Sequence, residues 1–80
     1  MTRATVLYFA SLRDAAGRAD EVVESGAADL RGLYEELRGR YGFAHPVARL
    51  RVAVDGAFAD WDEGLREGSE VAFIPPVSGG

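Results

Sequence analysis

The chain has 80 residues, a formal net charge of −4 at pH 7 and no cysteine. This length suits a single domain, the negative charge disfavours binding to nucleic acid, and the lack of cysteine excludes disulfides and thiolate zinc sites. No apolar run approaches the roughly 20 residues of a membrane-spanning helix, and the start lacks the apolar core of a signal peptide. We therefore expect a soluble, cytoplasmic protein with no nucleic-acid or membrane partner.

The first predicted element is an apolar strand over residues 5–10. Side chains alternate between the two faces of a strand, so Val6 and Tyr8 should share one face and Leu7 and Phe9 the other. Because almost every residue of the run is apolar, the sequence predicts a central strand that is covered on both faces.

A loop or short helical turn over residues 11–18 and a short strand over residues 21–24 should follow. The clearest element is a helix over residues 30–41, the only one expected to exceed two turns. Asp29 is a good N-cap because its carboxylate accepts hydrogen bonds from free backbone amides, and Gly42 suits a left-handed residue after the last turn. Apolar side chains recur at helical spacing and should pack on a sheet, namely Leu30, Leu33, Leu37 and Tyr41.

Two further strands are predicted over residues 50–54 and 57–58, joined by the hairpin signal Asp55-Gly56, and a last strand over residues 71–74. The order strand, strand, helix, strand, short strand, strand predicts an α+β fold with one helix on one face of a mixed sheet. We expect one shared core that contains Val6, Tyr8, Leu33, Leu37, Val52 and Val71.

No set of side chains in the sequence forms a recognisable catalytic or metal-binding pattern. His45 has no partner at ligand spacing, and the acidic run over residues 60–63 lacks the glycine and the bidentate glutamate of a calcium loop. We therefore expect no metal site. The reactive group should be the C-terminal carboxylate of Gly80, which needs activation because a carboxylate is a poor electrophile.

The C-terminus is the most informative stretch of the sequence. Pro75-Pro76 must end the last strand because neither proline donates to a sheet, and two adjacent prolines favour an extended backbone. The four residues that follow can reach roughly 13 Å when extended, and glycine fits a slot too narrow for any other residue. The sequence thus predicts a body over residues 1–75 and an extended tail over residues 76–80 that threads a channel. The alternative is an ordinary frayed terminus.

Residues 70–80, EVAFIPPVSGG, together with residues 6–13, VLYFASLR, resemble the small, sulfur-carrying subunit of molybdopterin synthase, the MoaD family. The resemblance spans nearly the whole chain. Sulfur carriers for thiamine synthesis and ubiquitin also end in Gly-Gly, whereas the preceding Pro-Pro-Val-Ser points to this family. The resemblance implies a ubiquitin-like β-grasp fold, in which the first and last strands lie side by side and parallel.

The resemblance also implies a function. In the family, a MoeB-like enzyme of the ubiquitin-activating type uses ATP to adenylylate the terminal glycine, and a sulfur donor protein then displaces AMP. The resulting thiocarboxylate enters the large, MoaE-like synthase subunit and donates sulfur to the cyclic pterin precursor in molybdenum cofactor biosynthesis. The chain alone would be no enzyme and would bind no cofactor. It would be the sulfur-donating subunit of a heteromeric transferase.

By resemblance, the reactive group is Gly80, and the tail residues that pass into the partner are Val77, Ser78 and Gly79. The positions that contact the large subunit or the activating enzyme are Phe9, Phe58 and Ile74, which would share the face away from the helix with Leu7. The chain departs from many relatives at Ile74, where they carry a second aromatic residue. Other readings remain open: a sulfur carrier for thiamine or tRNA thiolation, a ubiquitin-like modifier conjugated to lysines, or a plain binding module.

Overall fold

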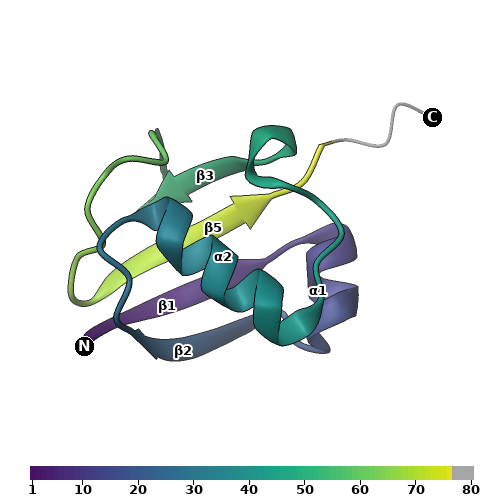
Figure 1. Ribbon diagram of the computed structural model, residues 1–80, viewed down its shortest axis with the longest axis horizontal. Coiled ribbons are helices and arrows are strands. Elements are labelled where there is room, and N and C mark those ends of the chain that lie inside the picture. The colour runs from purple at the N-terminus through teal and green to yellow at the C-terminus, as the bar shows by residue number, and fades with distance from the viewer. Residues whose placement is uncertain (77–80) are drawn as a thin grey trace.

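A mixed five-stranded sheet in the order β2-β1-β5-β3-β4 forms the frame of the molecule (Figure 1). The computed structural model describes residues 1–76. β1 and β5 are parallel neighbours, and the other neighbouring strands are antiparallel. The strands are β1 (Thr2–Tyr8), β2 (Asp20–Ser25), β3 (Arg51–Val54), β4 (Ala57–Ala59) and β5 (Ser69–Ile74). This topology confirms the predicted α+β class and the parallel pairing of the first and last strands.

The helix α2 (Leu30–Tyr41) lies across one face of the sheet, and its bounds are those that the sequence predicts (Figure 1). It begins at Leu30 because Asp29 caps it: the Asp29 carboxylate accepts a hydrogen bond from the Gly32 amide at 2.8 Å. It ends because Gly42 adopts a left-handed conformation with φ of 74°. Within residues 1–76 it is the only helix longer than two turns, since α1 (Ala10–Ala16) has seven residues and η1 (Val47–Arg49) has three.

The core lies between α2 and the sheet. All six residues predicted to share it are buried there. Tyr34, which the predicted apolar stripe omits, is also fully buried and donates a hydrogen bond from its hydroxyl to the His45 carbonyl at 2.6 Å. Its ring contacts that of Phe73 with centroids 5.2 Å apart, and Phe73 in turn stacks on Trp61. An aromatic cluster thus fills the end of the core below the helix.

The prediction that the first strand is covered on both faces is wrong. Val6 and Tyr8 are buried, but Leu7 is only half-buried and Phe9 is 45% exposed. The reason is that both helices contribute their buried side chains to the same core, so the described residues supply a layer for only one face of the sheet. The predicted strand also runs too far, because Phe9 is the N-cap of α1 and the strand ends at Tyr8.

The Asp55-Gly56 hairpin is confirmed. Asp55 and Gly56 both have positive φ, 51° and 89°, as a type I′ turn requires. The turn is tied to the centre of the sheet, because the Asp55 amide donates to the Glu70 carbonyl and the Asp55 carboxylate accepts from the Glu70 amide, both at 2.9 Å. The hairpin therefore fixes β4, and with it Phe58, relative to β5.

β5 ends at Ile74, directly before Pro75, as the two prolines predict. Pro75 is buried and Pro76 is exposed. The proposed division into a body over residues 1–75 and a tail over residues 76–80 stays a prediction, because residues 77–80 lie outside the described part of the chain. In the described part, no helix has the length and apolar character needed to cross a membrane.

Candidate functional site

The face of the sheet opposite α2 carries a continuous row of apolar side chains. Cross-strand register pairs Leu7 of β1 with Ala72 of β5, Ala72 with Ala53 of β3, and Ala53 with Phe58 of β4. Paired residues point to the same face of a sheet, and their neighbours along each strand point into the core. The row therefore lies on the open face, where the family resemblance places Leu7 and Phe58.

Ile74 and Phe9 lie next to this row, at the end of the sheet from which the chain continues into Pro75. Ile74 is half-buried at the end of β5. Phe9 follows Tyr8, whose partner in β5 is Phe73, and its extended backbone keeps the alternation, so Phe9 lies beside Ile74 on the open face. Phe58 is 65% exposed. We call Leu7, Phe9, Phe58 and Ile74 the docking patch. The structure thus brings the predicted contact residues together, and their contact with a partner stays a prediction.

A cation lies within the docking patch, and sequence reasoning missed it. Arg51 is the cross-strand partner of Ile74, and its guanidinium carbon lies 4.7 Å from the centre of the Phe58 ring. A guanidinium at this distance from an aromatic face is attracted by the ring. The signal that would have revealed it is the strand alternation, which puts Arg51 and Ala53 on one face and Val52 on the other.

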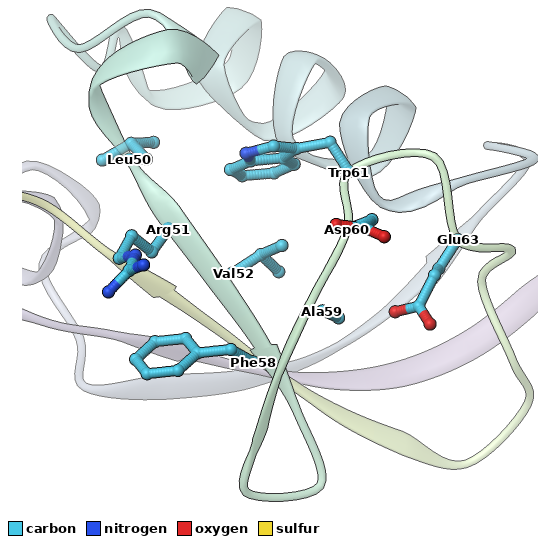
Figure 2. A pocket seen from close by; sticks show the side chains of 8 residues that line it. All are labelled: Leu50, Arg51, Val52, Phe58, Ala59, Asp60, Trp61 and Glu63. Atoms are coloured by element: carbon cyan, nitrogen blue, oxygen red, sulfur yellow. The ribbon is translucent and has the colours of Figure 1, made fainter.

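A hollow of about 320 Å³ lies beside Phe58, around the short edge strand β4 (Figure 2). Trp61 lies on the side of the hollow below α2, whereas Arg51 and Phe58 lie on the other side of β3. The Trp61 indole stacks on Phe73 with an angle of 5° between the rings, so this wall of the hollow is aromatic. The carboxylates of Asp60 and Glu63 complete the lining. Among residues 1–76, no three or more histidine or acidic side chains cluster closely enough to hold a metal ion.

The end of β1 that presents Phe9 is anchored by the partly buried carboxylate of Glu21. Glu21 accepts hydrogen bonds from the hydroxyls of Tyr8 at 2.7 Å and of Tyr41 at 2.5 Å. Burial by itself raises the pKa of Glu21, but the two hydrogen bonds and the charge of Arg18 outweigh it, so the pKa lies below its ordinary value. Burial and the hydrogen bond to Glu21 raise the pKa of Tyr8 well above its ordinary value. The cluster is therefore a neutral phenol pair around an ionised carboxylate and serves to hold β1, β2 and α2 together.

His45, for which the sequence suggests no role, is a loop residue. Its Nε2 atom lies 3.2 Å from the Ser11 hydroxyl oxygen, and its carbonyl accepts from Tyr34. These contacts pin the loop between α2 and η1 to the start of α1. Among residues 1–76, no acidic side chain hydrogen-bonds the His45 ring to orient it for catalysis.

The predicted reactive and tail residues are Val77, Ser78, Gly79 and Gly80, and all four lie outside the described residues. The structure therefore describes the surface from which the tail departs and not the tail itself. That surface carries exposed apolar side chains and the cation of Arg51. The chain leaves the sheet beside it, through Pro75 and Pro76.

The comparisons with known proteins agree with this architecture. Residues 6–80 match the model of the ThiS family. A curated relative, the molybdopterin synthase sulfur carrier subunit of Mycobacterium tuberculosis, is 34% identical over 83 residues, and the match covers 100% of both chains.

Two solved structures share the fold over nearly the whole chain. A candidate molybdopterin converting factor subunit 1 from Pyrococcus furiosus is 34% identical, with a TM-score of 0.81 over 96% of this chain and 100% of that one. SAMP1 from Haloferax volcanii is 27% identical, with a TM-score of 0.78 over 98% of this chain and 99% of that one. With its β-grasp sheet and its full-length match to curated sulfur carrier subunits, the chain belongs to the ThiS family of ubiquitin-like proteins.

Proposed function

We propose that the chain is the sulfur carrier subunit of molybdopterin synthase and that its reactive group is a thiocarboxylate at Gly80. The observation that carries this proposal is the similarity to a curated subunit of that name along 100% of both chains. The chain alone is then not an enzyme. It supplies sulfur within a heteromeric transferase, and the docking patch on the described surface supports this role as one subunit of a complex.

The chemistry needs activation of Gly80 by another protein. A MoeB-like enzyme transfers the adenylyl group of ATP to the terminal carboxylate, which converts a poor leaving oxygen into AMP and releases pyrophosphate. Sulfur at the sulfide level, delivered by a sulfur donor protein, then attacks the acyl carbon of Gly80; the carbon–sulfur bond forms as the bond to AMP breaks, and a thiocarboxylate remains. Its sulfur is a nucleophile at neutral pH without help from any residue of this chain. ATP is used in this step and is not a bound cofactor of the chain. We place the reaction in the cytoplasm, where ATP is available.

The docking patch supports the proposal that a large, MoaE-like subunit is the partner that binds the chain in the synthase. Exposed aromatic residues clustered on one face are typical of interface centres. Phe9 and Ile74 lie where the chain leaves the sheet, and Phe58 lies on the same face in β4, in register with Ala72 through Ala53. A partner seated on this patch would receive the tail directly. Val77, Ser78 and Gly79 would then occupy the channel of the partner that brings Gly80 to the pterin precursor.

Intact-protein mass spectrometry tests this proposal. The chain is incubated with its MoeB-like enzyme, ATP and a sulfur donor, and the mass should rise by one oxygen-to-sulfur exchange at the C-terminus. The matched control is a chain that lacks Gly80, whose mass should not change. An unchanged mass for the complete chain, with an activating enzyme that modifies another carrier in parallel, would refute the proposal.

A second candidate function is conjugation to other proteins, and it is favoured by the 27% identity to SAMP1. The small archaeal modifier proteins share this fold. In that case Gly80 would form an amide with a lysine of a target. Since the chain has no lysine and its last arginine is Arg66, trypsin would leave residues 67–80 attached to the target lysine. Finding this remnant in native extracts would support conjugation, and its absence alongside thiocarboxylate formation would support the sulfur carrier.

A further inference from the structure

Arg51 is the charged residue in the docking patch. We propose that it positions the chain on the large synthase subunit by pairing with an aspartate or glutamate of that subunit beside the entrance for the tail. The inference rests on the proposed function and goes beyond it, because it assigns a specific ionic contact to the interface.

Arg51 lies between two residues of the docking patch. It lies on the open face directly opposite Ile74, the last residue of β5 before the prolines. It also lies over the ring of Phe58, at 4.7 Å from the ring centre. Figure 2 shows both side chains on the same side of β3. Any partner that covers Phe58 and Ile74 must therefore also cover the guanidinium between them.

The charge of Arg51 is not neutralised by a carboxylate within residues 1–76. The three ion pairs within residues 1–76 use Arg18, Arg31 and Arg38, so Arg51 has no carboxylate partner in this part of the chain. A partner that covered the guanidinium without supplying an anion would bury an unpaired charge, which is strongly unfavourable. The chain as a whole has a charge of −4, so a partner matched only to its overall charge would be basic. A carboxylate at this one point is a specific requirement.

The chain's own terminal carboxylate does not meet this requirement in the proposed complex. Gly80 is six residues beyond Ile74, roughly 20 Å away along an extended tail. The tail must be extended for Gly80 to reach the pterin precursor. The anion therefore has to come from the large subunit.

The stacking on Phe58 makes Arg51 a better docking residue than a free surface arginine. An arginine that already lies on a ring loses less side-chain freedom when it binds, and its planar guanidinium can hold both oxygens of a carboxylate. The pair would lie between Phe58 and Ile74 under the bound partner, where it is shielded from water. Such a pair is screened by salt much less than an exposed one.

Calorimetric titration of the full chain with its recombinant large subunit tests the proposal. Arg51→Met keeps the apolar cover of Phe58 and removes the charge, and Arg51→Glu reverses the charge. The matched control is Arg66→Met, because Arg66 is exposed, forms none of the ion pairs in the described residues, and precedes β5 at the end far from the tail. Circular dichroism establishes that each variant is folded.

We expect Arg51→Met to raise Kd about thirtyfold, which corresponds to about 2 kcal/mol, and Arg51→Glu to raise it further. Arg66→Met should leave Kd within about twofold. The loss for Arg51→Met should be similar at about 0.05 M and about 0.3 M salt, since the pair is shielded. Changing one aspartate or glutamate of the large subunit to its amide should raise Kd for the wild-type chain. The same change should have little further effect on Kd for Arg51→Met.

An unchanged Kd for Arg51→Met, or a loss that disappears at the higher salt concentration, would overturn the inference and leave the proposed function intact. A large-subunit surface on which no single acid shows this coupling would overturn it as well. If the wild-type chain itself did not bind the large subunit, the proposed function would fail first. These failures are therefore distinguishable in one series of titrations.

Discussion

Phe73 and Ile74 are consecutive residues of β5 that face opposite sides of the sheet. Phe73 packs in the core, and Ile74 belongs to the docking patch. Phe73 is fully buried and contacts Tyr34 and Trp61, whereas Ile74 is half-buried on the open face opposite Arg51. Strand alternation alone produces this division. The residue that stabilises the core and the residue that borders the tail are thus separated by one peptide bond.

The first prediction concerns this pair of residues. Phe73→Ala should lower the free energy of unfolding by about 3–5 kcal/mol because it leaves a cavity among aromatic rings, whereas Ile74→Ala should lower it by about 1 kcal/mol or less. Urea unfolding followed by circular dichroism measures both. Phe73→Leu is the graded control, with an intermediate loss expected. Equal losses for Phe73→Ala and Ile74→Ala would mean that Ile74 belongs to the core.

The second prediction concerns Phe58, the most exposed aromatic residue of the docking patch. Phe58→Ala should weaken binding to the large subunit by about 2 kcal/mol or more, because it removes an aromatic anchor and the ring under Arg51. The melting temperature should change little, since the side chain is 65% exposed. Titration calorimetry and thermal unfolding on the same samples check both statements. Unchanged affinity with a collapsed melting temperature would place Phe58 in the core instead.

The third prediction concerns pH and Glu21. Because the pKa of Glu21 in the folded chain lies below its ordinary value of 4.5, its ionised form stabilises the fold above about pH 4.5, and this stabilisation is lost as the pH falls through the lowered pKa. Glu21→Gln should therefore be less stable than the wild type at pH 7 by about 1–3 kcal/mol, and the difference should shrink in acid.

Urea unfolding at pH 7 and at about pH 3.5 checks the prediction for Glu21. Glu24→Gln is the matched control, because Glu24 is an exposed glutamate on the same strand. The free energy of unfolding of Glu24→Gln should equal that of the wild type at both pH values. A difference between Glu21→Gln and the wild type that is the same at pH 7 and in acid would show that the Glu21 charge does not stabilise the fold.

The fourth prediction concerns the start of α2. Asp29→Ala should lower the free energy of unfolding by about 1 kcal/mol because the Gly32 amide loses its acceptor. Asp29→Ser should retain most of the stability, since a serine oxygen can cap the same amide. Chemical unfolding of the two variants side by side measures this. Equal losses for alanine and serine would show that the cap is not what Asp29 contributes.

Local signals account for what the sequence predicts well. The ends of α2 depend on Asp29 and Gly42, and the hairpin depends on Asp55 and Gly56, so a few adjacent residues decide each feature. The predicted core followed from helix and strand periodicity. The tail prediction rested on its composition, and the structure does not test it.

Strand periodicity alone could not show that one face of the sheet lacks a covering layer, and only the family resemblance predicted it. The apolar residues Leu7 and Phe9 suit a buried strand as well as a docking surface, and only the layer arrangement distinguishes the two. Tyr34 was missed although its spacing, four residues after Leu30 and three before Leu37, places it on the buried face of α2; its hydroxyl donates to the His45 carbonyl in the loop that follows the helix. The stacking of Arg51 on Phe58 depends on the register between β3 and β4.

The fifth prediction concerns the free end of the chain. One residue added after Gly80 should abolish sulfur transfer, because the reactive carboxylate is displaced, and Gly79→Val should do nearly the same, because a β-branched side chain stiffens and widens the backbone. Binding to the large subunit should largely persist in both variants, since the docking patch is unchanged. One residue added before Met1, which is 84% exposed, is the matched control and should transfer sulfur normally.

The formation of molybdopterin in a reconstituted synthase is the most direct test of the sulfur carrier function. The assay contains the large subunit, the MoeB-like enzyme, ATP, a sulfur donor and the cyclic pterin precursor, and it compares the wild-type chain with the chain extended after Gly80. We predict molybdopterin from the wild type and none from the extended chain, with the extended chain still bound to the large subunit. Molybdopterin formed by the extended chain, with its C-terminus shown intact by mass spectrometry at the end of the reaction, would contradict the account.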